Sequence, residues 1–152
     1  PPLSTAQIER SARRWCATYQ PDLERCVPLI AVGVAPNPRS VKRTLHTLSL
    51  VSSTRAAMQL PTSPETLALL TKIVVTQTSY EPFYRELTRR PNLILELERA
   101  SAEATGPQHC EVPGTQLMVP PRLSAMLRRA PHFPADPAQA EALLANLLYY
   151  HA

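Results

Sequence analysis

Residues 37–43, Asn-Pro-Arg-Ser-Val-Lys-Arg, show most directly how this chain folds. Asparagine is a preferred helix N-cap, and proline suits the first helical position because its missing N–H has no partner there. The segment therefore predicts the start of a helix that runs to about Leu60. Its inward-facing positions are expected to include Val41, Leu45, Leu48 and Met58.

Comparable signals mark other helix starts along the chain. Ser4 with Gln7 forms a capping-box pattern and predicts a helix to about Thr18. Ser63 followed by proline predicts another helix, to about Ser79. Further helices are expected over 23–34 with Asp22 as cap, over 83–89, after Pro91, over 122–130, and from Asp136-Pro137 to about Tyr150. The helical spacing of Ile8, Ala12, Trp15 and Tyr19 predicts that all four face the core.

The composition favours an all-α fold. The chain has 152 residues with 17 Pro and only 3 Gly, and 44% of its residues are hydrophobic while 18% are charged. So little glycine argues against hairpins with glycine-dependent turns and against a glycine-rich phosphate loop. We expect one domain, residues 1–152, built as an irregular bundle of about six to eight short helices. An irregular loop over 103–120 is expected to separate a helical region at 1–102 from C-terminal helices at 121–152.

Positive charge is concentrated in one part of the sequence. The net charge is +4, and no acidic residue lies between Glu24 and Glu65. Within or beside that gap stand Arg25, Arg39, Lys42, Arg43 and Arg55. Such a stretch attracts phosphates, acidic proteins or nucleic acid. A solvated basic face is the alternative.

Arg39, Lys42 and Arg43 are the candidate binding residues. They follow a helix start, where unpaired backbone N–H groups and the helix dipole favour an anion. Arg39 and Arg43 are four residues apart and share a face. Alternatively, these side chains cap carbonyls, or lie along apolar neighbours with their charged heads in water.

The sequence contains no catalytic or metal-binding motif. A P-loop, H-E-x-x-H and G-x-S-x-G are all missing, and the four histidines are isolated from one another. Cys16, Cys26 and Cys110 lack a CxxC pair, which favours reduced thiols in a cytosolic protein over a disulfide framework or a metal site. We find no apolar stretch long enough to span a membrane and no signal peptide. We therefore expect a cytoplasmic chain that is not catalytic alone, and its Pro-Pro start suggests a piece of a longer protein.

Tyr80, Phe83 and Tyr84 form an aromatic cluster in the sequence. Such a cluster can be a partner site, but aromatic residues at this spacing more often belong to the core. We expect the core role here.

Two motifs resemble the helical region that follows the catalytic core in KAP-family P-loop NTPases. Pro1-Pro2-Leu3-Ser4 is similar to the first landmark of that region, and Asn37-Pro38-Arg39 with Lys42-Arg43 is similar to the second. The stretches 66–70 and 80–84 resemble the next helices, so the resemblance covers roughly residues 1–100. The chain departs from the family at Leu45-His46, where Phe-Leu-Asn is frequent.

The resemblance implies a lid and sensor region that lacks the catalytic core. Arg39 would then sense the γ-phosphate of ATP bound to the missing core, and Lys42 and Arg43 would support the core–lid interface or the phosphates. It implies ATP and Mg²⁺ in the parent protein, with no cofactor held by this chain alone. The NTPase core would be the main partner, and the basic or aromatic surface could take a further protein.

An alternative function remains open. The chain could be a stand-alone helical interaction module that binds a protein or nucleic acid through the basic stretch 25–55. Nucleic acid is disfavoured because the aromatic residues are few and are not interleaved with the basic ones, as stacking platforms would be.

Overall fold

The computed structural model describes residues 1–103, 108–112 and 115–148. Within these ranges the chain forms eight α-helices, one 3₁₀ helix and one two-stranded hairpin. The elements in chain order are α1 (Thr5–Tyr19), η1 (Pro21–Cys26), α2 (Val27–Gly33), α3 (Pro38–Ala57), α4 (Pro64–Ser79), α5 (Glu81–Arg89), α6 (Leu93–Ala102), β1 (Gln108–Val112), β2 (Thr115–Val119), α7 (Pro121–Leu127) and α8 (Pro137–Leu148). The predicted all-α class, an irregular helical bundle, is confirmed.

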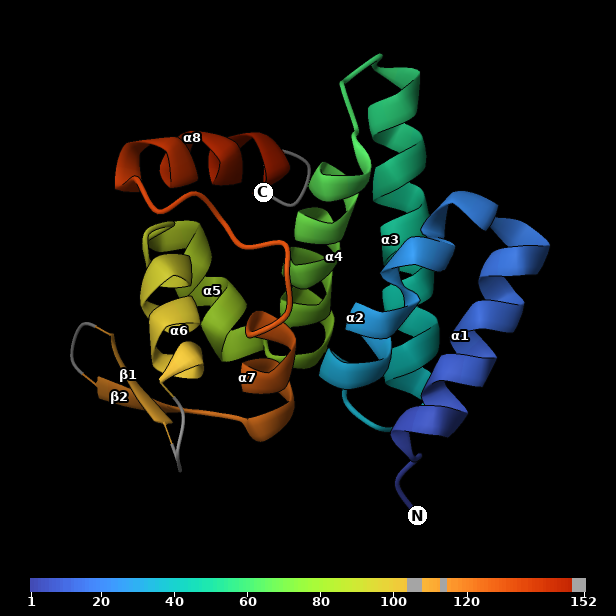
Figure 1. The fold of residues 1–152 in the computed structure, drawn as a ribbon, viewed down its shortest axis with the longest axis horizontal. Coiled ribbons are helices and arrows are strands. Elements are labelled where there is room, and N and C mark those ends of the chain that lie inside the picture. Colours follow the sequence, from blue (N-terminus) through green and yellow to red (C-terminus); the bar gives the residue numbers. More distant parts are fainter. Residues whose placement is uncertain (104–107, 113–114, 149–152) are drawn as a thin grey trace.

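The two longest helices, α3 and α4, lie side by side in the middle of the molecule (Figure 1). Helix α1 flanks α3 on one side, while α5, α6 and α7 lie on the opposite side of α4 (Figure 1). Helix α8 lies across one end of the bundle, and the hairpin lies at its edge beside α6 (Figure 1).

Three predicted helix starts are made by local side-chain caps. In the capping box of α1, Gln7 N–H donates to Ser4 Oγ (3.1 Å) and Ser4 N–H donates to Gln7 Oε1 (2.8 Å). Asn37 Oδ1 accepts from the Ser40 N–H at the start of α3 (2.8 Å), and Ser63 Oγ accepts from the Thr66 N–H at the start of α4 (3.1 Å). Each cap satisfies donors that a helix start otherwise leaves without a partner.

Helix α4 is the centre of the core. Its Leu70, Ile73 and Val74 are fully buried. The threonines of this helix use their hydroxyls internally, since Thr71 donates to Leu67 O and Thr76 donates to Lys72 O, both at 2.8 Å. Bonding one turn back removes the cost of burying these hydroxyl groups. A stretch rich in β-branched residues therefore forms a buried helix, as predicted.

Two local predictions are wrong. The segment 23–34 is not one helix capped by Asp22, because the 3₁₀ helix η1 precedes α2. Pro28 fits only in a first turn, so α2 starts anew at Val27. The expected loop over 103–120 contains the antiparallel hairpin β1–β2, in which Gln108 pairs with Val119 and Val112 with Thr115. Strand alternation explains this: Val119 is buried while Met118 is 59% exposed.

Two predicted core positions are also wrong. Ile8 and Ala12 are fully buried as expected and Trp15 is half-buried against the core, but Tyr19 is 69% exposed. Met58 is 51% exposed. Helix α1 turns its buried face toward α2, so the residues on the side of α3 stay accessible. Met58 follows the last residue of α3 at the end of the helix, where chain reversal through the left-handed Gln59 (φ 56°) carries it away from the core.

Three cationic side chains bind backbone carbonyls inside the fold. Arg122 donates to Ala31 O (2.6 Å) and Val34 O (2.9 Å) at the end of α2. Lys72, fully buried, donates to Arg129 O (2.6 Å) and Pro131 O (2.7 Å) beyond α7 and, more weakly, to Leu127 O (3.4 Å) at its last residue. Arg55 donates to Pro61 O (3.1 Å) and to Asn146 Oδ1 of α8 (3.1 Å). Charge in this chain therefore serves partly to satisfy carbonyl groups at the ends of helices.

Candidate functional site

The start of α3 presents the three candidate binding residues together. Arg39, Lys42 and Arg43 are all exposed and lie in the first two turns of this 20-residue helix. Helix α3 has no acidic residue, and no ion pair joins any of the three to a side chain within the described ranges. The positive end of a helix dipole and three cations thus occur at one place.

Both motifs of the family resemblance meet at this place. The Leu3 N–H donates to Pro36 O at 2.8 Å, which holds the residues before α1 against those before α3. The two helices then run side by side in the same direction (Figure 1). Farther along, the Ser49 hydroxyl of α3 donates to Gln20 Oε1 at 2.9 Å. The landmarks that lie far apart in the sequence are therefore neighbours in space.

A hollow of about 370 Å³ lies between these two helices. It is lined by Leu3, Gln7, Ser11 and Trp15 from the first helix and its approach, and by Pro38, Val41, Lys42 and Leu45 from α3. Lys42 is its one charged lining residue, so the hollow is an apolar groove with a cation on its wall. We call it the α1/α3 groove.

Aromatic side chains continue along the α1/α3 groove. The ring of Trp15 lies 5.5 Å from that of Tyr19 and 5.7 Å from that of His46, measured between centroids. Both contacts are tilted, with interplanar angles of 45° and 35°. Leu50, one turn beyond His46 on α3, is 68% exposed. The sequence predicts Trp15 and Tyr19 as core residues and therefore does not indicate this surface. The available signal is His46, a polar residue one helical turn after Lys42.

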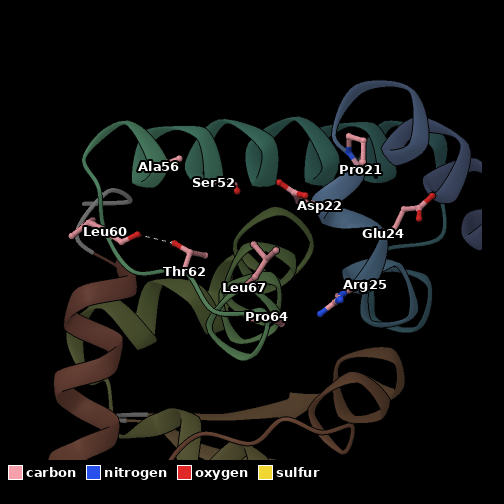
Figure 2. A pocket seen from close by; sticks show the side chains of 10 residues that line it. All are labelled: Pro21, Asp22, Glu24, Arg25, Ser52, Ala56, Leu60, Thr62, Pro64 and Leu67. Atoms are coloured by element: carbon pink, nitrogen blue, oxygen red, sulfur yellow. Dashed lines mark hydrogen bonds between the residues drawn. The ribbon is translucent and has the colours of Figure 1, made fainter.

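The basic stretch does not form one surface. Arg55 is 2% exposed and bonded inside the fold, so it is not part of the basic surface expected over 25–55. Arg25 lies by a second hollow, of about 720 Å³, between η1 and the end of α3. Figure 2 shows Asp22 directed toward Ser52 across this hollow, with Leu67 between them and Arg25. Its lining holds two carboxylates, Asp22 and Glu24, against the one cation Arg25, so the second hollow does not favour an anion.

A polar cluster that the sequence did not predict surrounds Lys72. Glu98 of α6 accepts the Phe133 N–H (3.0 Å) and lies 3.2 Å from His132 Nδ1. Burial lowers the pKa of Lys72 to about 8, against the attraction of Glu98, and burial raises the pKa of Glu98. Because Nζ already donates to three carbonyls, this lysine is occupied in holding the chain together and is not placed to react with a substrate.

The aromatic cluster and the two buried cysteines pack within the core of the fold. Phe83 is buried, and Tyr80 and Tyr84 are half-buried against the core, which supports the core role of this cluster. The Tyr80 hydroxyl donates to Gly33 O, and burial raises the pKa of Tyr80 to about 12. Cys16 and Cys26 are buried thiols. Burial is the main cause that raises the pKa of Cys16 to about 11, and the neighbouring Cys26 raises it further. The described residues include no group of three or more His, Cys, Asp or Glu side chains placed to hold a metal ion.

Comparison with known proteins gives no match: no family model, no curated protein and no solved structure is similar to the chain. Among the described helices, none is both long and apolar enough to cross a membrane.

Proposed function

We propose that this chain is the helical lid and sensor region of a KAP-like P-loop NTPase. In this role Arg39 contributes to ATP sensing, and the region couples the nucleotide state to partner proteins. The observation that carries the proposal is the cluster of exposed cations at the capped start of α3. The meeting of the motifs around Leu3 and Asn37 supports it, because both belong to the family resemblance.

Arg39 suits a phosphate contact for physical reasons. Its guanidinium offers several donors in a fixed plane, and it stands where the dipole of α3 favours an anion. Stabilising charge on a transferring phosphoryl group is work that a positioned arginine does well. Lys42 and Arg43, one turn farther along, would support the interface with the NTPase core.

The NTPase core would supply the rest of the site. Bound there, ATP with Mg²⁺ provides the phosphoryl group to be transferred, and Arg39 of this chain orients toward its phosphates when the lid closes. As the family resemblance implies, the NTPase core would hold the Mg²⁺. We place the whole protein in the cytoplasm, where thiols such as Cys16 and Cys26 stay reduced.

The test is the ATPase turnover of the full-length protein with Arg39→Ala. Loss of one charge-stabilising donor costs about 100-fold in kcat where it acts on the transition state. Arg85→Ala is the matched control, because Arg85 is an exposed arginine of α5, 61% exposed and paired with Glu81 at 2.8 Å. Wild-type turnover in Arg39→Ala would refute phosphate sensing, as would a full-length sequence without Walker A and Walker B motifs.

A further inference from the structure

The α1/α3 groove combines three properties that a docking surface needs. It is concave, with a volume of about 370 Å³, which is at the small end of the range for binding pockets. Its lining is mostly apolar, with Leu3, Val41 and Leu45 among its residues. Beyond it the exposed Tyr19 and Leu50 extend the apolar surface. The nucleotide role proposed for Arg39 uses none of these residues.

The walls of the groove limit the shape of a ligand. Both are α-helices, whose backbone groups are bonded within each helix, so an extended peptide has no strand edge to pair with. A helix is different, since it presents a row of apolar side chains and needs no backbone partner from the groove. Helices α1 and α3 run in the same direction (Figure 1), and the residues that line the groove recur at helical spacing along both of them.

The charge around the groove determines whether an acidic or a basic ligand is attracted. Lys42 lies in the wall of the groove, on α3, a helix without acidic residues. Glu9, the acidic residue of α1, is paired with Arg13 at 3.0 Å. An acidic ligand therefore meets attraction at this rim, whereas a basic one meets repulsion.

We infer that the α1/α3 groove binds an acidic amphipathic helix of a partner protein. Apolar side chains of that helix enter the hollow beside Trp15, and its carboxylates face Lys42. Single-stranded nucleic acid fits less well, because stacking needs an open ring face and the Trp15 ring already contacts Tyr19 and His46. The inference goes beyond nucleotide sensing by Arg39, and it gives Lys42 a partner helix in addition to the support of the core interface proposed above.

The chain carries a suitable probe. Trp15 is its single tryptophan and lines the groove, so fluorescence emission reports on this surface alone. The ligand to titrate is a synthetic helical peptide of about four turns, with leucines along one face and glutamates beside them. Two matched peptides serve as controls: one carries lysine in place of every glutamate, and the other carries serine in place of every leucine.

The expected result is a saturable change in Trp15 emission with the acidic peptide, weakened by added salt. Lys42→Glu should weaken binding about tenfold by turning attraction into repulsion at the rim. Ser11→Phe, which fills the hollow without changing charge, should weaken it to a similar extent. Arg85→Glu on α5 changes the net charge as much as Lys42→Glu does and should leave the affinity within about twofold. Ser11, Lys42 and Arg85 are all exposed, so circular dichroism should show an unchanged fold.

Several outcomes would overturn the inference. These are no saturable signal up to about 1 mM peptide, equal binding of the lysine peptide, or undiminished affinity in both Lys42→Glu and Ser11→Phe. Tighter binding of a single-stranded oligonucleotide or of anionic lipid vesicles would also do so, because it would make the ligand a different class of molecule. Failure here leaves the ATPase effect of Arg39→Ala untouched, and Arg39→Ala should still bind the peptide because Arg39 does not line the groove.

Discussion

Lys72 shows how one residue can join distant parts of the chain. Its ammonium group has three N–H donors, and three carbonyls from residues 127–131 lie within 3.4 Å. Burial lowers its pKa to about 8, so at pH 7 the charged form still predominates and all three donors are present. A buried lysine is thus kept because it completes hydrogen bonds that the chain beyond α7 would otherwise leave unmade.

We predict that Lys72→Met destabilises the protein by about 1–3 kcal/mol at pH 7, because buried carbonyls lose their donor. The difference should widen with pH. An unfolded Lys72 has the ordinary pKa of 10.5, so between about pH 8 and 10.5 the unfolded chain binds more protons than the folded one. Wild type should therefore gain stability relative to Lys72→Met across this window. Urea titrations of both proteins at several pH values measure it, and a difference constant from pH 7 to 10.5 would contradict it.

At the scale of elements, α2 and α7 approach one another very closely. Gly33, the last residue of α2, faces Met126 of α7. A Cβ added at Gly33 would lie 2.5 Å from Met126 Sδ and 2.9 Å from its Cβ, closer than real atoms approach. Glycine is needed here for space.

We predict that Gly33→Ala costs about 1–3 kcal/mol through overpacking, measured by urea unfolding. Met126→Ala alone should cost about 2–5 kcal/mol because it leaves a cavity. The double variant should lose less than the sum, since removing the methionine side chain makes room for the new methyl group. Additive losses of stability would show that the Met126 side chain does not limit the size of the residue at position 33.

The sequence predicts the beginnings of these elements better than their ends. Ser4, Asn37 and Ser63 act on N–H groups two or three residues away, so their signals are readable locally. The end of α2 depends on Arg122, about ninety residues farther along, and no local pattern reveals it. The hairpin was hidden by a composition typical of loops.

The same distinction applies to the candidate site. Arg39, Lys42 and Arg43 were readable from the helix start and are exposed as expected. The α1/α3 groove was not readable, because helical periodicity alone places Trp15 inward without saying how far α3 lies from it. Arg55 shows the reverse error: it counts as surface charge in the sequence and is buried in the fold.

At the scale of the whole molecule, Arg55 joins the middle of the chain to its last described helix. The side chain of Arg55, on α3, donates to Pro61 O in the connection to α4 and to Asn146 Oδ1 of α8. Helix α8 itself buries Leu144 and Leu147. The attachment of α8 therefore combines a polar clamp at one end with apolar packing along its length.

We predict that Arg55→Leu loosens α8 and lowers the stability by about 2–3 kcal/mol, because the carbonyl of Pro61 and the amide of Asn146 lose a charged donor. Limited proteolysis should then cut within α8 faster than in wild type. Arg39→Leu is the matched control, since Arg39 lies on the same helix but is exposed, and its cleavage pattern should not change. Equal cleavage of wild type and Arg55→Leu would show that apolar packing alone holds α8.

The three carbonyl-binding cations have a consequence for how the molecule opens. Arg122 ends α2 and Lys72 secures the chain after α7, each from a distant element, whereas Arg55 bonds the link after its own helix and also Asn146 of the distant α8. A helix end capped only by its own neighbouring residues could fray alone, but the bonds to Ala31 O, Arg129 O and Asn146 Oδ1 are lost only when a second element moves away. Fraying of these helix ends is thereby coupled to the unfolding of the whole molecule. Amide hydrogens near Ala31, Pro61 and Arg129 should exchange with solvent together, in one cooperative unit, although they lie far apart in the sequence.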